Sequence, residues 1–277
     1  MGIFARLLSK VRGEADDLNL DFNEEEDQEK PQPEFAMPLV RFSGGPGGGK
    51  SFDMIRIGTY AAFHYRYPVI VQDTKGDLTV YINQMIDTLS KKKTKLAEKK
   101  IAFLKDNKRF KVIREMNGLT MFAIVKEIQD RSSKMKERRP SCYLIVDEAG
   151  TLRDNTRRDE KNTSIEFWNI AATFRNAGIL CYATSHRELG DGGVPPLARE
   201  TTRAVVLYSA YDEVNYFGVD IDQALTTKPL SKEKVFIDCI DRKLKTFPLD
   251  NGPIAEGQIP EVLIHPVNVT RIKKMEF

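Results

Sequence analysis

The sequence of 277 residues predicts an α/β fold with a mainly parallel, doubly wound sheet and helices on both faces. Three observations favour this class. A glycine-rich stretch lies between a strand-like and a helix-like run, short apolar runs then alternate with amphipathic segments, and several apolar runs stop at polar residues. With 41% hydrophobic residues, the chain can fill one sizeable core, or a core with a small appendage.

The glycine-rich stretch reads SGGPGGGKSFD over residues 43–53. Each glycine in a helix costs up to about 1 kcal/mol relative to alanine. Because five glycines occur here within six positions, the stretch is expected to be a loop. The strand-like run 38–42 precedes it, and apolar residues at helical spacing follow it. Gly44-x4-Gly49-Lys50-Ser51 therefore fits the phosphate-loop pattern in its strand–loop–helix setting, which disfavours a flexible linker or a chance match.

A phosphate loop predicts a nucleotide site. Its bare backbone N–H groups can converge on phosphate oxygens, and the N-terminus of the next helix adds partial positive charge. We expect Lys50 to reach the β- and γ-phosphates of ATP and Ser51 to hold Mg²⁺ through its hydroxyl. The residues expected to bind ATP are Gly45, Pro46, Gly47, Gly48, Gly49, Lys50, Ser51 and Phe52.

The N-terminal region differs from the rest in composition. Residues 1–13 predict a short amphipathic helix, which packs on the protein's own body or docks on a membrane surface or partner. Residues 14–34 carry ten acidic side chains and one lysine, as a disordered linker does, so the folded part should begin near residue 35. Because the whole chain still has a net charge of +3, its body is basic and compatible with a polyanionic partner.

The remaining elements alternate along the chain. After the loop helix we expect a strand at 68–72, a helix through 81–89, a strand at 110–114, a helix at 119–134 and strands at 143–146, 179–183, 204–208, 235–238 and 244–249, the last two as a hairpin. Residues 91–111 hold ten basic side chains against two acids, which form a solvated helix face or contact nucleic-acid phosphates. No internal repeat is visible.

The run CYLIVDEAG stops at two adjacent acids, as a buried strand does when it reaches a ligand crevice. We expect Asp147 to help hold Mg²⁺ and Glu148 to orient and deprotonate water. The strand at 179–183 should lie next to the phosphate-loop strand, which makes His186 a candidate γ-phosphate sensor, the alternative being a structural histidine. Loop and carboxylates are expected to meet at neighbouring strand ends.

Four segments together resemble the FtsK–HerA superfamily of DNA-pumping ATPases: GGPGGGKS, QDTKGDL, YLIVDEAG and FRNAGILCYATSHR. The resemblance implies a RecA-like P-loop NTPase core assembled into a ring, usually a hexamer, with ATP at each subunit boundary. Arg175 matches the arginine that reaches the neighbouring subunit's γ-phosphate, where a cation stabilises the transferring group. A helix C-terminal arginine is the alternative. His186 stands where relatives commonly carry a sensor glutamine.

The resemblance implies a Mg²⁺-dependent ATPase that translocates double-stranded DNA as a homo-oligomeric ring. Within that superfamily, the compact size of the chain and its lack of a membrane anchor favour packaging of a viral genome. Its catalytic residues would be Lys50, Glu148, Arg175 and His186, with Ser51 and Asp147 as metal ligands. The basic segments expected to line a DNA channel are 91–111, 131–139 and the arginines at 153, 157 and 158. The alternatives are a Zot-like filamentous-phage assembly ATPase, a non-motor nucleotide switch or kinase, and a non-hydrolysing interaction subunit.

The expected domains are an N-terminal helix with its acidic linker at 1–34, a RecA-like core at 35–210, and a small C-terminal β-rich extension with a hairpin at 211–277. The N-terminal helix is a candidate contact for a capsid or membrane-associated protein. No run of about 18 apolar residues and no signal-peptide block occur, which predicts a cytoplasmic or virion-associated protein. The three cysteines lack metal-ligand spacing and should be reduced.

Overall fold

The computed structural model describes residues 37–114, 124–128, 142–151, 167–168, 171, 174, 179–186, 193–208, 217–220 and 232–264. Its strands are β1 (Leu39–Ser43), β2 (Val69–Gln72), β3 (Phe110–Ile113), β4 (Cys142–Val146), β5 (Ile179–Ser185), β6 (Thr202–Leu207), β7 (Glu233–Asp238) and β8 (Lys243–Pro248). Its helices are α2 (Lys50–Tyr65), α3 (Asp77–Ser90), α4 (Lys95–Lys105), the 3-10 turn η1 (Ala149–Thr151), α8 (Pro196–Glu200) and α10 (Glu261–Ile264). The expected N-terminal helix, its acidic linker and the basic segment 131–139 lie outside the described residues.

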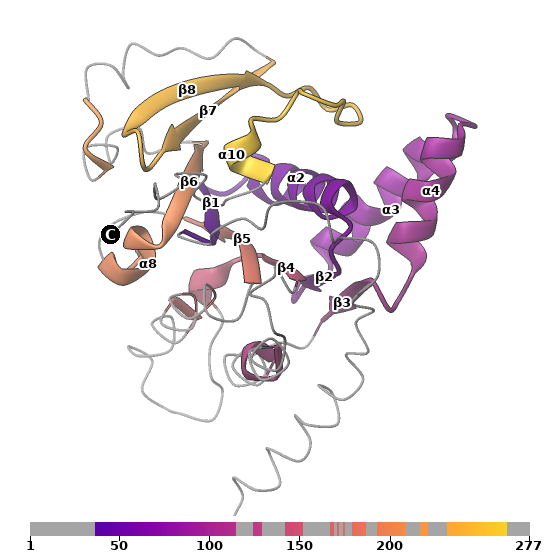
Figure 1. Ribbon diagram of the computed structural model, residues 1–277, viewed down its shortest axis with the longest axis horizontal. Coiled ribbons are helices and arrows are strands. Elements are labelled where there is room, and N and C mark those ends of the chain that lie inside the picture. Colours follow the sequence, from indigo (N-terminus) through magenta and orange to yellow (C-terminus); the bar gives the residue numbers. More distant parts are fainter. Residues whose placement is uncertain are drawn as a thin grey trace, which may run out of the picture.

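The eight strands form one sheet in the order β3-β2-β4-β5-β1-β6-β7-β8 (Figure 1). The first six run parallel, and β7 and β8 continue the sheet as an antiparallel hairpin. Each strand expected from the sequence is present, with its ends shifted by one or two residues. The mainly parallel α/β fold is thus confirmed.

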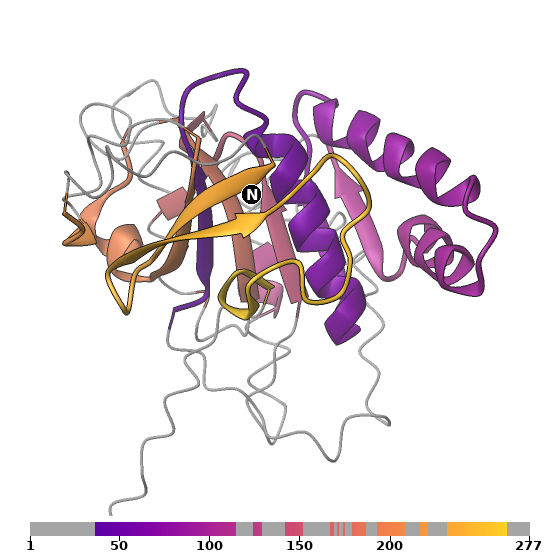
Figure 2. The same cartoon turned by 90° about the horizontal axis from the view of Figure 1, so that it is seen from above.

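Both faces of the sheet are buried, because successive side chains of a strand point to opposite faces. In β4, Tyr143 and Ile145 pack in the cluster that contains α2, whereas Cys142, Leu144 and Val146 pack in the cluster that contains the helical residues 124–128. Figures 1 and 2 show α2, α3 and α4 together on one side of the sheet. The continuous apolar runs of the sequence therefore reflect strands covered on both faces.

Helix α2 packs on the sheet at Gly58. A Cβ atom added there would stand 2.8 Å from Ile145 Cδ1 and 3.3 Å from Tyr182 Cδ2. Because real Cβ atoms essentially never come within 3.0 Å of another heavy atom, a side chain at this position would require Ile145 or the helix to shift. Glycine allows the observed packing without that shift.

The described C-terminal residues belong to the same core as the rest. The hydroxyl of Tyr143 donates to the Ile264 carbonyl at 2.9 Å, and that of Tyr182 donates to the Leu263 carbonyl at 2.9 Å. Leu263 and Ile264 are buried against α2, and Figure 2 shows the segment before them passing over that helix. The division of the chain at residue 210 stays a prediction.

The cysteines and the apolar character of the helices complete the description of the fold. Cys142 and Cys181 are buried and Cys239 is half-buried, and all three are free thiols, as expected. Burial raises the pKa of the Cys142 thiol to about 12. Among the described helices, none combines the length and the apolar character that crossing a bilayer would require.

Candidate active site

Polar side chains from four strands gather at one edge of the sheet. Strands β1, β2, β4 and β5 are parallel, so their carboxyl ends share an edge, where ligands bind in open α/β sheets. As expected, the strand that leads to His186 pairs directly with the phosphate-loop strand, Ser43 opposite Ser185. The loop and the carboxylates meet, as expected, but the strands that carry them are not direct neighbours, because β5 lies between β1 and β4.

The loop between β1 and α2 has the backbone of a phosphate cradle. Gly47 and Gly49 have φ angles of +79° and +88°, a region that favours glycine. A Cβ at Gly48 would lie 3.2 Å from the Cβ of Tyr208, which follows β6. Two of these glycines therefore serve backbone conformation, and the third allows close packing of the loop on the sheet.

Lys50 is the first residue of α2 and is buried, with 6% of its surface exposed. Its ammonium group donates to the Gly45 carbonyl at 2.7 Å, so the side chain spans the loop. Burial lowers the pKa of Lys50, and the nearby carboxylates of Asp147 and Glu148 oppose that shift. The lysine is thus held at the loop with the two acids close enough to influence its charge.

Ser51 and Asp147 are in direct contact. Ser51 Oγ donates to Asp147 Oδ1 at 2.9 Å, and Thr184 Oγ1 donates to the same oxygen at 2.8 Å. Thr184 Oγ1 also accepts from the Glu148 N–H at 2.6 Å. Thr184 of β5 thereby contacts both acids that follow β4, through the Asp147 carboxylate and the Glu148 backbone, a contact that the sequence did not reveal.

The two expected metal ligands have the chemistry that Mg²⁺ prefers, a hydroxyl and a carboxylate oxygen. Within the described residues, no cluster of three or more His, Cys, Asp or Glu side chains is placed to hold a metal ion. Mg²⁺ is usually bound by one or two carboxylates together with substrate phosphates and water. Ser51 and Asp147 therefore fit a Mg²⁺ ion that arrives with a nucleotide.

Glu148 faces two basic side chains. Lys75 Nζ donates to Glu148 Oε1, and His186 Nε2 lies 4.0 Å from the same oxygen. The bond to Glu148 raises the pKa of Lys75. Glu148 itself has a φ of +49°, rare for a residue with a side chain, and the bonds of its N–H to Asp147 and Thr184 hold it there.

Comparison by sequence gives no relative: no family model matches the chain, and no curated protein does. Comparison with solved structures does give matches. The genome packaging NTPase B204 from Sulfolobus turreted icosahedral virus 2, in complex with AMP, matches with a TM-score of 0.50 at 12% identity, over 78% of this chain and 98% of that one. A DnaB-like replicative helicase, studied with its primase interactions, matches with a TM-score of 0.52 at 11% identity, over 79% of this chain and 58% of that one.

The chain has the RecA-like P-loop NTPase fold. At such low sequence identities the structural similarity shows the fold alone, because one fold can carry many functions. Of the residues expected to act in nucleotide hydrolysis, the structure brings together Lys50, Ser51, Asp147, Glu148 and His186. Arg175 lies outside the described residues, as do the arginines at 153, 157 and 158.

The segment QDTKGDL, which follows β2, makes two separate sets of contacts. Asp73 accepts hydrogen bonds from the backbone N–H groups of Gly76, Leu78 and Thr79 at 2.9, 3.1 and 2.8 Å, so it stabilises the start of α3. Lys75 instead reaches Glu148. The sequence carried one signal for this contact, since a polar segment after a strand belongs at the ligand edge, but it did not show that β2 pairs with β4.

A second buried acid fixes the first turn of α2. Asp53 accepts from the Tyr208 hydroxyl at 2.7 Å and pairs with Lys234 at 3.2 Å and Arg56 at 3.3 Å. Burial raises the pKa of Tyr208 well above its ordinary value, so the hydroxyl stays protonated. Strands β6 and β7 thereby hold the P-loop helix in place.

Phe52 was expected among the ATP-binding residues. Its ring packs edge-on against Tyr81 at 5.3 Å between centroids, and the Arg56 guanidinium lies 4.9 Å from its centroid. Its side chain therefore serves the packing of α2 on α3. A contact of Phe52 with a nucleotide, if it forms, would come from its backbone N–H at the start of the helix.

Proposed function

We propose that this chain is a Mg²⁺-dependent ATPase that moves double-stranded DNA as an oligomeric ring and packages a viral genome. One observation carries the ATPase assignment: Ser51 Oγ lies 2.9 Å from Asp147 Oδ1. This contact joins the end of the phosphate loop to the acidic pair Asp147 and Glu148. These are the parts that P-loop hydrolysis needs, a phosphate cradle, a lysine, two oxygen ligands and a base. A solved structure with this fold holds AMP.

The residues have distinct tasks in this proposal. Lys50 exchanges its bond to the Gly45 carbonyl for phosphate oxygens, and Ser51 and Asp147 hold the ion. The Mg²⁺ ion, when bound, neutralises charge on the phosphates. Glu148 receives a proton from the attacking water, and its bond to Lys75 fixes the direction of the carboxylate.

The DNA part of the proposal rests on other features. The stretch 91–111 carries ten basic side chains against two acids, and phosphate contacts without base readout suit a motor that tracks any sequence. Structures of this fold include a viral genome packaging NTPase and a replicative helicase. The ring and the action of Arg175 on a neighbouring γ-phosphate follow from the FtsK–HerA resemblance.

Steady-state hydrolysis with and without duplex DNA tests both parts. We expect Mg²⁺-dependent ATP turnover that duplex DNA accelerates, that Lys50→Ala abolishes, and that Glu148→Gln lowers by at least a hundredfold while ATP still binds. Full turnover by Glu148→Gln would overturn the mechanism. Turnover that ignores DNA would overturn the motor and favour a nucleotide switch or kinase.

Light scattering tests the ring separately. We expect the particle mass to rise to that of a closed ring when ATP and duplex DNA are added. A monomer under every condition contradicts the ring and removes the role of Arg175 in the neighbouring site. The ATPase assignment would survive that result, because Lys50, Ser51, Asp147 and Glu148 all come from one chain.

A further inference from the structure

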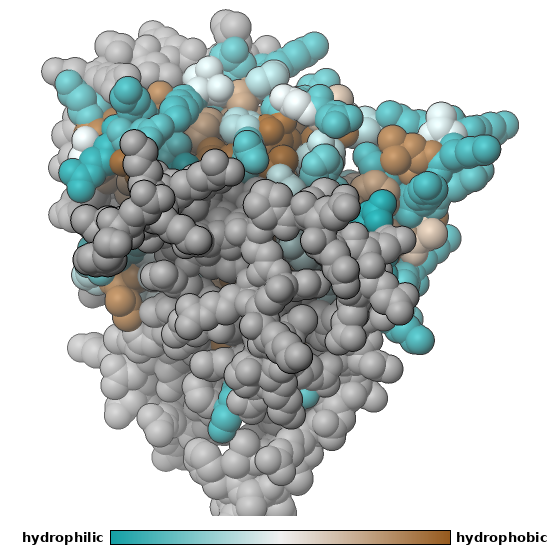
Figure 3. Space-filling view, in the orientation of Figure 1, coloured by the Kyte–Doolittle hydropathy of each residue, from teal (hydrophilic) through white to brown (hydrophobic). Residues whose placement is uncertain are grey.

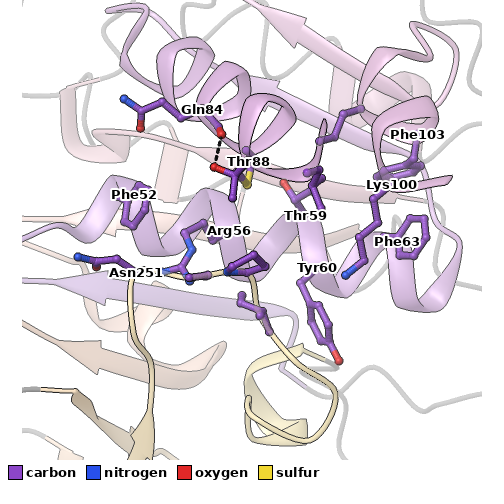
Figure 4. A pocket seen from close by; sticks show the side chains of 16 residues that line it. Phe52, Arg56, Thr59, Tyr60, Phe63, Gln84, Thr88, Lys100, Phe103 and Asn251 are labelled. Atoms are coloured by element: carbon purple, nitrogen blue, oxygen red, sulfur yellow. Dashed lines mark hydrogen bonds between the residues drawn. The ribbon is translucent and has the colours of Figure 1, made fainter. Parts of the chain in front are cut away.

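Two adjoining hollows lie beside α2, away from the phosphate loop. The first has a volume of about 190 Å³ and lies between α2, α3, α4 and residues 251–254 (Figure 4). The second is more open, about 730 Å³, and continues along α4 to residues 254–256. Both are lined by Tyr60, Phe63, Lys100, Phe103 and Ile254, so together they form one depression, which we call the α2–α4 groove.

The floor of the groove holds polar groups suited to a ligand. Thr59 is 8% exposed and lines the smaller hollow, and its hydroxyl has no hydrogen-bond partner among the described residues. A buried hydroxyl without a partner costs free energy that a ligand atom can recover. Lys100 Nζ lies 5.7 Å from the ring centroids of both Tyr60 and Phe63, and burial lowers its pKa, so an anion would stabilise its charged form.

The rim of the groove is basic and partly apolar. His64, Arg66, Lys99 and Arg109 line it, against the acids Asp106 and Glu256. Leu96 also lines it and is 56% exposed. Figure 3 shows apolar side chains among hydrophilic ones on the side of the molecule occupied by α3 and α4. The groove therefore suits a ligand that carries both negative charge and apolar groups.

We propose that the α2–α4 groove binds this chain's own residues 16–27, DDLNLDFNEEED. The segment carries seven acids and no basic residue, and Leu18, Leu20 and Phe22 alternate with polar residues. In an extended conformation these three side chains point the same way. A cavity of about 150 Å³ admits benzene, so the smaller hollow has room for one such side chain. The acids would face Lys99, Lys100 and Arg109.

The segment can reach the groove within one chain. Met37 precedes β1, at the amino edge of the parallel strands, and α2 runs back to that same edge at Tyr65. Strands β1 and β3 stand four intervals apart in the sheet, roughly 19 Å, and a helix layer adds about 10 Å. Extended chain from Met37 to Phe22 spans up to about 50 Å, which exceeds the path.

A nucleic acid fits these features less well. Duplex phosphates could meet the exposed lysines of α4, but a duplex presents no apolar side chain to the hollow beneath them. Occupation of the α2–α4 groove by residues 16–27 is independent of the proposed ATPase activity.

Hydrogen exchange on the full chain tests the contact. We expect residues 96–106 and 251–256 to exchange at least tenfold more slowly in the native chain than in a Leu20→Asp/Phe22→Asp variant. Asn19→Ser/Asn23→Ser is the matched control, since those positions alternate with the apolar ones, and it should leave protection unchanged. Equal exchange in all three proteins overturns the proposal.

Peptide binding to the Leu20→Asp/Phe22→Asp chain tests the groove itself. A labelled peptide of residues 14–30 should bind to this chain, and adding Leu96→Asp should weaken that binding at least tenfold. Leu197→Asp is the matched control, because Leu197 is also an exposed leucine, 48% exposed, but lies on α8. It should leave peptide binding unchanged. A second peptide with Leu18, Leu20 and Phe22 changed to serine keeps the charge. If it binds equally well, the apolar hollow is not used and the proposal fails.

Two further outcomes would reassign the groove. Protection that grows with protein concentration means that the segment comes from a second copy, which overturns the assignment to the same chain. Duplex DNA that protects residues 96–106 in the native chain, with no protection by the peptide, assigns the groove to nucleic acid. Protection independent of concentration, with DNA competing against the peptide, supports the proposal.

Discussion

Ser51 Oγ and Asp147 Oδ1 are 2.9 Å apart, although 96 positions separate the two residues in the chain. The contact joins the first turn of α2 to the end of β4, across the end of β5 that lies between β1 and β4. It brings a phosphate loop and an acidic strand end into one site. The first prediction follows from this pair.

Ser51→Ala and Asp147→Asn should each lower kcat for ATP by about a hundredfold, because in the proposed mechanism the two residues hold the same Mg²⁺ ion. The double variant should be scarcely worse than either single one, since residues that act as a unit are not additive. A Mg²⁺ titration of turnover measures this. Ser90→Ala, at an exposed helical serine whose hydroxyl donates to the Ile86 carbonyl, is the control and should be neutral. Additive losses would show that the two residues act separately.

Lys75→Ala should lower kcat roughly tenfold with little change in KM, because it leaves Glu148 without the partner that directs its carboxylate. Lys75→Arg should restore much of the loss. A structural role alone would instead show as a change in stability without the selective fall in kcat. Kinetic constants for the three proteins, with melting temperatures alongside, separate these cases.

The Lys75–Glu148 pair also predicts a pH dependence of stability. The pKa of Lys75 is raised above 10.5 in the folded chain, so the contribution of the pair is complete below 10.5 and disappears as pH rises through the raised value. The melting temperature of the native chain should exceed that of Lys75→Ala by a constant, small amount from pH 7 to 10. That difference should shrink at higher pH. A difference that already vanishes near neutral pH would contradict the ion pair.

Gly58→Ala should destabilise the protein by about 1–2 kcal/mol, since overpacking typically costs more than the helix propensity of alanine returns. The new methyl group would meet Ile145 Cδ1 at 2.8 Å. Ile145→Val removes that atom, so the double variant Gly58→Ala/Ile145→Val should regain part of the loss. Urea unfolding of the four proteins gives the coupling. Strict additivity would mean that α2 moves away from the sheet instead.

Tyr208→Phe should cost about 1 kcal/mol of stability, the usual net value of one hydrogen bond, because Asp53 keeps Lys234 and Arg56 as partners. The affinity for ATP should fall as well, since Asp53 fixes the turn that carries Lys50 and Ser51. Tyr81→Phe is a matched control at an aromatic residue that packs on Phe52. Nucleotide titration and urea unfolding measure the two effects. An unchanged affinity would show that the anchor serves the fold alone.

Much of the site was accessible from the sequence because its parts are encoded by short patterns. Five glycines ahead of Lys50 and Ser51 disfavour a helix or strand and indicate a loop, and an apolar run that stops at Asp147 and Glu148 identifies a buried strand and the edge where it ends. The strands were predicted with small errors at their ends for the same reason. Each of these features depends on residues close together in the chain.

Other relationships depended on which segments became neighbours in space. The pairing of β5 with β4, the contact of Lys75 with Glu148, and the hydrogen bonds from Tyr143 and Tyr182 to the carbonyls of α10 are examples. Apolar periodicity shows that a strand is buried, but it does not show which strand pairs with it. By itself the sequence determined the elements and the chemistry at their ends, whereas strand order, and with it the partners of each polar group, was decided only when the core packed.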